Sequence, residues 1–273
     1  MLDIERIRTA LAGNDFVSSV IYLDEIESTN EYCSSPEIPI DTLVITNNQT
    51  AGKGRNQRKW LSEKNSNLTF SIKKKLNISP SENQSIIRFF SYYVYLTLLE
   101  VLSKSKTQEK IEKDLIIKWP NDILFKGKKL CGILTEAKLP SDVYVIGIGI
   151  NCNQHTFPSG LNATSLREIF GVETDISALL ISLIQNFSLN FEQLKPENLN
   201  NLFEKWKSAA DMIGKHCEFA LPTGMLNSGQ IMDLNYDGSI SVRVNGKIEK
   251  YFAGDLRVTF LTNVFCSLLH KIT

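Results

Sequence analysis

The chain has 273 residues, of which 42% are hydrophobic and 22% are charged, and its 30 basic residues balance its 30 acidic ones. These values are typical of globular proteins and leave room for one large domain, or for a large and a small one. Because the net charge is zero, no overall field favours nucleic acid or a membrane surface; we expect neither as a partner, and an anion must be bound by a local group of cations.

Cysteine and histidine usage predicts no disulfide framework and no metal site. No two cysteines form a Cys-x-x-Cys pair, and the three histidines share no ligand spacing with them. The cysteines are Cys33, Cys131, Cys152, Cys217 and Cys266. Their odd number and scatter indicate free thiols in a reducing compartment. The N-terminus has no signal-peptide pattern, and no run approaches the roughly twenty apolar residues that span a bilayer, so we expect a cytoplasmic protein.

The first predicted elements are a short helix, a strand and a second helix start. Residues 1–19 place apolar residues at helical spacing, and Val20–Ile26 alternates as a strand. Ser28 then stands where a helix N-cap is expected, with Glu31 in the first turn. Taken alone this is a capping sequence, although the free N–H groups of a helix N-terminus also suit a ligand.

The stretch Gln49–Trp60 combines glycines and cations between two apolar runs that read as strands. Gly52 and Gly54 allow a tight turn whose N–H groups approach a ligand without interference from a Cβ. The cations of this stretch are Lys53, Arg55, Arg58 and Lys59. They suit an anion, because guanidinium groups bind carboxylates and phosphates in bidentate fashion. By itself the stretch is more simply a solvated basic loop, and it has neither a Walker nor a Rossmann pattern.

The clearest predicted helix begins at Ser79–Glu82, which has the pattern of a capping box, and continues through Leu102. It is apolar almost all round, which predicts burial against a sheet and a core role for its aromatic residues. The run Lys73–Lys75 before it is interpreted as a solvated strand end.

Short strands are predicted next, at residues 115–117, 123–125, 130–135 and 143–150. Lys118 lies at the end of the first strand between two apolar residues, which favours burial of a functional cation. Gly147 and Gly149 share one face of the last strand and leave that face open to a ligand or to another backbone. If this last strand is exposed, it can pair with its copy across a two-fold axis.

The C-terminal part is predicted to be a separate small domain. Helices are expected at Ile176–Leu194 and Pro196–Ala210, and short strands with hairpin signals at Asp237-Gly238 and Asn245-Gly246 follow. Such a pattern predicts a small barrel. We therefore divide the chain into domains 1–212 and 213–273.

Five blocks of the sequence, taken in order, resemble the biotin protein ligases. They are Ser28–Asn30, Gln49–Trp60, Lys118–Asp122, Lys129–Leu134 and Gly147–Asn151. The resemblance is close over roughly Tyr22–Asn153 and looser as far as Arg257. It implies an α+β fold, in which a class II aminoacyl-tRNA-synthetase/biotin-ligase-like catalytic domain (a mixed sheet with helices) precedes a small SH3-like β-barrel. Many relatives begin with a DNA-binding module, for which the residues before Val20 leave no room, so we expect a monofunctional form.

The resemblance implies an ATP-dependent biotin protein ligase. In this reaction the carboxylate of biotin attacks the α-phosphate of ATP to form biotinyl-5′-AMP, and a lysine of a biotin carboxyl carrier protein then accepts the biotin. ATP and Mg²⁺ are the implied cofactors, and no metal is expected on the protein's own ligands. Such chemistry needs mainly positioning and charge neutralisation.

The functional residues of the family carry over to matching positions in this sequence. Lys118 and Arg55 are implied to be catalytic. The implied biotin-binding residues are Ser28, Thr29, Asn30, Gln49, Gly52, Lys53, Gly54, Arg55, Lys118, Gly132, Gly147 and Gly149. The implied ATP-binding residues are Arg55, Arg58, Trp60, Asn121 and Asn151. Two positions depart from the family pattern, because Lys53 stands where arginine is common and Gln57 where many bacterial relatives have glycine.

Two alternatives remain open at this point. A lipoate or octanoate protein ligase shares the fold, but this sequence lacks the Arg-Arg-x-x-Gly-Gly-Gly-type loop of those families. A biotin-binding protein without turnover would keep the residues for the biotin head, yet Lys118 and Arg55 are both present. The assembly is expected to be a monomer or a homodimer.

Overall fold

The structure is a computed structural model. It describes residues 2–55, 58–103, 111, 113–138, 142–220, 226–252 and 259–260. The chain divides into two compact units, Met1–Ala209 and Ala210–Thr273, whereas the sequence-based boundary falls after residue 212. Gln57, Cys266 and most of the tail after Arg257 lie outside the described residues.

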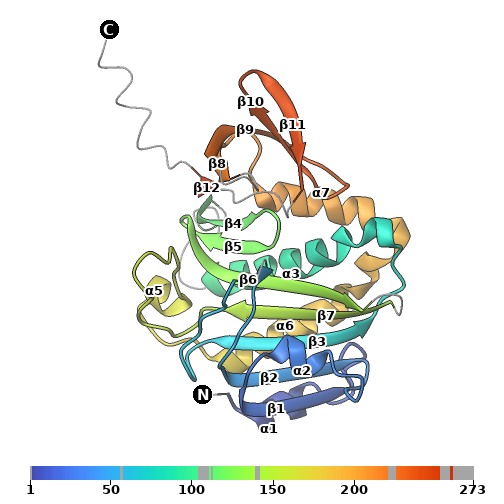
Figure 1. Ribbon diagram of the computed structural model, residues 1–273. Coiled ribbons are helices and arrows are strands. Elements are labelled where there is room, and N and C mark those ends of the chain that lie inside the picture. The colour runs from blue at the N-terminus through green and yellow to red at the C-terminus, as the bar shows by residue number, and fades with distance from the viewer. Residues whose placement is uncertain are drawn as a thin grey trace. The chain divides into compact units, whose positions relative to one another are not determined.

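The first unit is built on a seven-stranded mixed sheet (Figure 1). Its strands are β1 (Ser19–Ile26), β2 (Thr42–Gln49), β3 (Leu68–Lys75), β4 (Leu115–Lys118), β5 (Asp122–Phe125), β6 (Lys128–Lys138) and β7 (Val143–Ile150). Their order is β1-β2-β3-β7-β6-β5-β4, with β1 and β2 parallel and the other neighbours antiparallel. The mixed sheet with helices that the resemblance implied is therefore present. Pairing of β7 across a two-fold axis was wrong, because β3 and β6 occupy both of its edges.

Helices lie on both faces of this sheet (Figure 1). The helices described up to Ala210 are α1 (Ile4–Ala10), α2 (Thr29–Cys33), η2 (Pro80–Glu82), α3 (Gln84–Ser103), α5 (Leu166–Phe170), α6 (Ile176–Asn190), η3 (Phe191–Leu194), η4 (Pro196–Asn198) and α7 (Leu199–Ala210). In the view of Figure 1, α3 and α6 lie behind the sheet and α2 lies in front. The rings of Phe89 and Phe90 on α3 pack against Phe187 on α6 and are fully buried, so the expected core role of these aromatics is confirmed.

The start of the long helix differs from the sequence prediction. Pro80–Glu82 forms a short 3₁₀ helix, and the α-helix begins only at Gln84. The Ser79 side chain makes no capping bond to the backbone and donates instead to the carboxylate of Glu82, at 2.8 Å. The segment Pro80–Ser103 is also long and apolar enough to cross a membrane, against the sequence expectation, but 72% of its apolar window is buried inside the protein, as in a core helix.

Two of the three lysines at the end of β3 are buried and only Lys75 is exposed, which corrects the sequence interpretation of a solvated run. Lys73 and Lys74 are only 6% and 4% exposed. Lys73 Nζ donates to the carbonyl oxygens of Ser35 and Ile38, both at 2.7 Å, and thereby pins the chain that follows α2.

Lys74 is buried because an anion, a carbonyl and two rings replace its water shell. Its Nζ lies 2.6 Å from Asp41 Oδ1 and donates to Phe16 O at 2.9 Å. It also lies 4.5 Å from the centroid of the Phe16 ring and 5.0 Å from that of Phe191. Lys74 therefore ties β3 to the chain before β1 and to η3.

Lys74→Ala is expected to lower the free energy of unfolding by about 2–3 kcal/mol, since Asp41 and a buried carbonyl lose their partner. Lys75→Ala is the matched control, because Lys75 is the exposed neighbour in the same run and should change stability by no more than about 0.5 kcal/mol. Urea unfolding of both variants checks this. Equal losses of stability in the two variants would mean that Lys74 contributes no more than an exposed lysine does.

The second unit is a five-stranded antiparallel sheet of order β11-β10-β9-β8-β12. Its strands are β8 (His216–Ala220), β9 (Leu226–Leu234), β10 (Ile240–Val244), β11 (Lys247–Tyr251) and β12 (Thr259–Phe260). Asn245 and Gly246 form the expected two-residue loop between β10 and β11, with φ of 48° and 81°, the left-handed values that such a turn requires. The four cysteines that the structure describes are free and buried.

Candidate active site

The N-terminus of α2 lies on the front face of the sheet, held by a chain of polar side chains. Ser28 is its N-cap, as predicted, and its Oγ accepts from the N–H of Glu31 at 3.4 Å. Ser28, Thr29 and Asn30 are each no more than 5% exposed. Buried hydroxyls and amides need hydrogen-bond partners, and these partners come from β2, β3 and β6.

Thr29 is held from two strands. Its backbone N–H and its hydroxyl donate to Gln49 Oε1, at the end of β2, at 2.7 and 2.9 Å. The hydroxyl of Ser71 on β3 lies 2.8 Å from Thr29 Oγ1. Thr29 and Gln49, which the resemblance assigned to one ligand head, are thus brought together.

Asn30 fills the space above Gly147, where the sequence analysis expected an open face. Its Oδ1 accepts from Ser71 Oγ at 2.6 Å and its Nδ2 donates to Glu136 Oε2 at 2.7 Å. A Cβ on Gly147 would lie 2.1 Å from Asn30 Oδ1, a separation that no real pair of atoms tolerates. Glycine is required here for close approach of this side chain.

The loop between β2 and β3 is closed by its own backbone. The N–H of Gly54 donates to Arg58 O at 2.7 Å, and the N–H of Trp60 donates to Gly52 O at 2.8 Å. A Cβ on Gly52 would lie 2.7 Å from Trp60 O and 2.9 Å from Gln49 Nε2. The loop therefore passes directly beside Gln49. This close approach leaves no room for a Cβ and requires glycine at position 52.

Lys53 points to α2. Its Nζ lies 2.7 Å from Glu31 Oε2, and both side chains are exposed. The hydrogen bond with Glu31 raises the pKa of Lys53, with smaller contributions from the charges of Glu31, Glu136 and Glu27. Lys53 therefore stays protonated at the rim of the site.

The indole of Trp60 lies over the second glycine of β7. A Cβ on Gly149 would lie 2.4 Å from Trp60 Cε2, and one on Gly132, its partner on β6, would lie 3.2 Å from Trp60 Cζ3. The indole Nε1 is buried and has no hydrogen-bond partner among the residues that the structure describes. Side chains thus cover both glycines of β7, Gly147 by Asn30 and Gly149 by Trp60.

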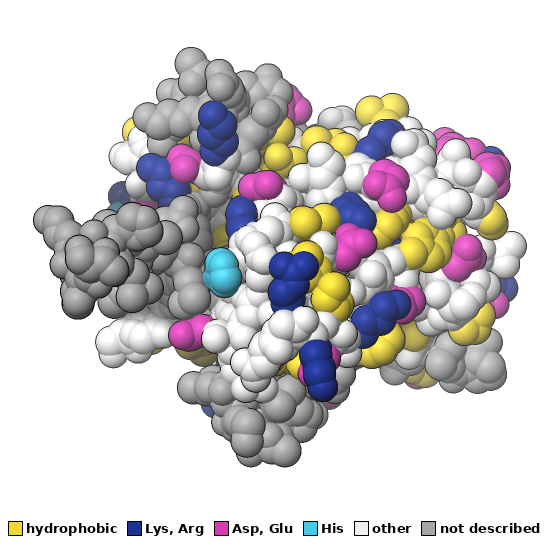
Figure 2. Space-filling model, turned by 90° about the horizontal axis from the view of Figure 1, so that it is seen from above, with side chains coloured by type: hydrophobic (Ala, Val, Ile, Leu, Met, Phe, Trp, Pro, Cys, Tyr) yellow, Lys and Arg dark blue, Asp and Glu magenta, His cyan; other side chains and the backbone are white. Residues whose placement is uncertain are grey.

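A cluster of cations surrounds Asp122 at the junction of β4, β5 and β6. On the face shown in Figure 2, basic side chains are interspersed with acidic ones, as a zero net charge predicts. The cluster around Asp122 differs from this pattern, because positive charge is in local excess there. Lys129 Nζ lies 2.8 Å from Asp122 Oδ1 and 5.7 Å from the Trp60 ring centroid. Lys118 is the partner of Asp122 in the β4–β5 ladder.

The pKa directions of two members of the cluster reflect its charges. Burial lowers the pKa of Lys118; Asp122 opposes this, and the neighbouring cations Lys129 and Arg58 add to it. Burial also lowers the pKa of Arg55, again opposed by Asp122 and reinforced by Arg58. Arg55, Lys118 and Lys129 thus all interact with the carboxylate of Asp122, and Arg58 adds a further positive charge. A bound anion would relieve this imbalance.

The two asparagines assigned to ATP hold backbone segments of the site. Asn121 Nδ2 donates to Ile133 O at 2.6 Å, and its Oδ1 lies 3.5 Å from Arg55 Nη1. Asn151 is 3% exposed, and its Nδ2 donates to the carbonyls of Lys129 and Thr164 at 3.2 and 3.1 Å. Asn121 therefore lies within the cation cluster, whereas Asn151 braces the chain behind Lys129.

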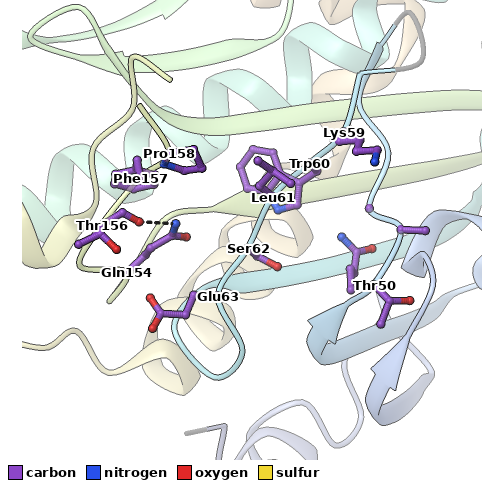
Figure 3. A pocket seen from close by; sticks show the side chains of 13 residues that line it. Thr50, Lys59, Trp60, Leu61, Ser62, Glu63, Gln154, Thr156, Phe157 and Pro158 are labelled. Atoms are coloured by element: carbon purple, nitrogen blue, oxygen red, sulfur yellow. Dashed lines mark hydrogen bonds between the residues drawn. The ribbon is translucent and has the colours of Figure 1, made fainter. Parts of the chain in front are cut away.

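A pocket of about 520 Å³ opens beside Trp60. It lies between the segment of Trp60 and Leu61 and the segment of Phe157 and Pro158 (Figure 3). Gln154 borders it and donates to Thr156 O at 2.8 Å. Gln49 and Gly52 also line this pocket, so it is continuous with the site.

Sequence reasoning missed four residues of this arrangement: Ser71, Asp122, Lys129 and Glu136. Ser71 carried a weak signal, as a hydroxyl inside an otherwise apolar buried strand. Asp122 and Lys129 stand inside the blocks that carry the resemblance, but nothing in the linear sequence indicates that they pair. Within the described ranges, no three His, Cys, Asp or Glu side chains are placed to hold a metal ion.

Comparison with known proteins gives concordant results. Residues 22–153 match the model of the Biotin/lipoate A/B protein ligase family. The bifunctional ligase/repressor BirA of Bacillus subtilis is 28% identical over 267 residues, which are 94% of this chain and 79% of that protein. The biotin--[acetyl-CoA-carboxylase] ligase of Mycobacterium tuberculosis is 27% identical over 214 residues, which cover 78% of this chain and 77% of that protein.

Solved structures share the fold. The biotin protein ligase from Aquifex aeolicus in complex with biotin and ATP superposes with a TM-score of 0.71 and 27% identity, over 89% of this chain and all of that one. The biotin protein ligase from Leishmania major in complex with biotinyl-5-AMP has a TM-score of 0.60 at 22% identity, over 86% of this chain and 99% of that one. The second likeness concerns the fold alone.

Proposed function

We propose that the chain is a member of the biotin/lipoate A/B protein ligase family and acts as an ATP-dependent biotin protein ligase, which the family match, the BirA relatives and the Aquifex aeolicus structure support. It forms biotinyl-5′-AMP and transfers the biotin to a lysine of a biotin carboxyl carrier protein. One observation carries the proposal: a polar chain rich in hydroxyl and amide groups and a cation cluster lie at the two ends of a single sheet face, around Gly147 and Gly149. Residues two apart on a strand are separated by roughly 7 Å, and biotin has a neutral ureido head at one end and a carboxylate at the other.

The polar chain provides the site for the ureido head. Ser28 and Thr29 present buried hydroxyl groups, and Gln49 a half-buried amide, at the N-terminus of α2. A cyclic urea has two N–H donors and a carbonyl acceptor, and such a site can satisfy both kinds of group. A ligand head without these groups would leave buried polar atoms of the site unpaired. That loss of binding free energy would make the site specific for a ureido head.

The cation cluster provides the site for adenylation. The biotin carboxylate oxygen forms a bond to the α-phosphorus of ATP as the bond to pyrophosphate breaks, so negative charge gathers on the phosphoryl oxygens. Arg55, Lys118 and Lys129 are positioned to stabilise that charge. Lys129 joins the residues that the resemblance named, because its amine lies beside Trp60 and Gly132.

We place the adenine in the pocket beside Trp60. Its walls of Trp60, Leu61, Phe157 and Pro158 offer flat apolar surfaces, and Arg58 is available for the phosphates. Mg²⁺ is proposed to arrive with the triphosphate, because it binds through few protein ligands and several phosphate oxygens, and it supplies charge neutralisation. Asn151 supports the backbone there.

The finer features of the resemblance are proposals of the same kind. The second unit is assigned as an SH3-like barrel, supported by its five short antiparallel strands and tight β10–β11 turn. A monomer or homodimer without nucleic-acid or membrane partners agrees with the balanced charge. Cytoplasmic location rests on the free thiols.

Biotin should drive ATP–pyrophosphate exchange by the purified protein, and lipoate and octanoate should not. The reason is the polar chain at α2, since neither of those acids has a urea to satisfy it. The measurement is exchange of labelled pyrophosphate into ATP with each acid, followed by mass spectrometry of a carrier domain incubated with enzyme, Mg-ATP and biotin. Equal exchange with lipoate would favour a lipoate ligase, and binding of biotin without exchange would favour a protein without turnover.

A further inference from the structure

Glu136 belongs to the polar chain although no sequence motif assigns it a role there. Gly147 pairs with Ser71 of β3 on one side and with Leu134 of β6 on the other. Glu136 follows Leu134 by two residues and therefore projects from the same face. The Asn30 amide lies across Gly147 and joins Glu136 to Ser71, with contacts of 2.7 and 2.6 Å. Three adjacent strands thus hold one side chain of α2.

The carboxylate of Glu136 sets the orientation of the Asn30 amide. A carboxylate only accepts, so the Asn30 amide must turn its Nδ2 toward Glu136 and its Oδ1 toward Ser71. The Ser71 hydroxyl then donates to Asn30 Oδ1. Its oxygen lies 2.8 Å from Thr29 Oγ1, whose own proton is donated to Gln49 Oε1.

A reversed Asn30 amide would break this arrangement. Its Oδ1 would face the carboxylate of Glu136, two acceptors with no proton between them, and its Nδ2 would face Ser71. The carboxylate of Glu136 therefore holds the amide in the observed orientation.

We infer that Glu136 is a positioning residue for the head-binding site: by accepting from Asn30 it holds the Asn30 amide across Gly147, with its Oδ1 on Ser71 and beside Thr29. The inference rests on the proposed function, because it takes Thr29 and Asn30 as part of the site for the ureido head. Glu136 itself is exposed and acts through Asn30 and Ser71.

The test exchanges the donor and the acceptor between the two side chains. Glu136→Gln introduces a group that can donate as well as accept, and Asn30→Asp places two acceptors face to face. Each single change should weaken biotin binding on the order of tenfold, as expected when one hydrogen bond is lost. The double variant E136Q/N30D restores one donor facing one acceptor and should recover most of the affinity.

A matched control exists outside the site. Glu25 accepts from Asn48 Nδ2 at 2.8 Å between β1 and β2, which is the same carboxylate–amide contact on an exposed surface. Glu25→Gln should leave the Kd for biotin unchanged. Titration calorimetry with biotin gives the Kd of each variant, and steady-state kinetics should show the KM for biotin rising while the KM for ATP stays constant.

The outcomes separate this inference from the proposed function. Wild-type protein that binds no biotin overturns the proposed function. Wild-type protein that binds biotin, with E136Q unchanged or with the two single effects simply adding in the double variant, overturns the inference alone. Thermal unfolding of the wild type, the two single variants and the double variant measures the same coupling without ligand. The double variant should be more stable than the sum of the two single changes in stability predicts. A purely additive result there also overturns the inference.

Discussion

Lys129→Ala is expected to lower the rate of biotin adenylation by about 10²-fold or more while the protein remains folded. Removing one preorganised positive group from a partly buried site where charge develops typically has an effect of this size. Lys129 Nζ lies against Asp122 at 2.8 Å and beside the Trp60 ring, so it belongs to the local positive excess. The measurement is biotin-dependent ATP–pyrophosphate exchange, with circular dichroism as the test of folding.

Two comparisons make this result interpretable. Lys128→Ala removes the same charge from the exposed neighbour and should leave exchange unchanged. Lys118→Ala, for which the sequence already predicts loss of adenylation, should be as severe as Lys129→Ala, because both amines act on Asp122. Near-normal exchange by Lys129→Ala would mean that Lys129 only pairs with Asp122 and does not stabilise the reacting phosphate. Lys118 would then be the lysine that acts in adenylation.

Local patterns predicted the elements of the site well, because their causes are local. The N-cap at Ser28 depends on the next three residues, and the strand at β7 depends on its own continuous apolar run. Glycines at 147 and 149 were correctly associated with close approach. What approaches them was not predictable, since Asn30 and Trp60 reach β7 only through the order β2-β3-β7-β6 of the sheet.

Features that depend on distant partners were missed or misread. Lys73 and Lys74 look solvated in the sequence because lysine runs usually are, and their burial depends on carbonyls and a carboxylate that are 33 to 58 positions away. Glu136 lies in an ordinary exposed strand position. Its role follows from Asn30, 106 residues earlier in the chain, and no linear pattern joins the two.

Gly147→Ala is expected to reduce the affinity for biotin by about 10²-fold and to lower the free energy of unfolding by about 1–3 kcal/mol. The new Cβ would lie 2.1 Å from Asn30 Oδ1 and 2.8 Å from Asn30 Cγ, so the amide must leave its place between Ser71 and Glu136. Both of its hydrogen bonds would then be lost, and each tenfold loss of affinity corresponds to roughly 1.4 kcal/mol.

A double-mutant cycle with Asn30→Ala tests whether this clash is the cause. If the Cβ of Gly147→Ala acts by displacing the Asn30 amide, the same substitution made in the Asn30→Ala background meets no amide and should cost much less stability. Chemical unfolding of the two single variants and the double variant measures this difference. Equal costs in both backgrounds would place the strain in the β7 backbone and would remove Asn30 as the reason for glycine at this position.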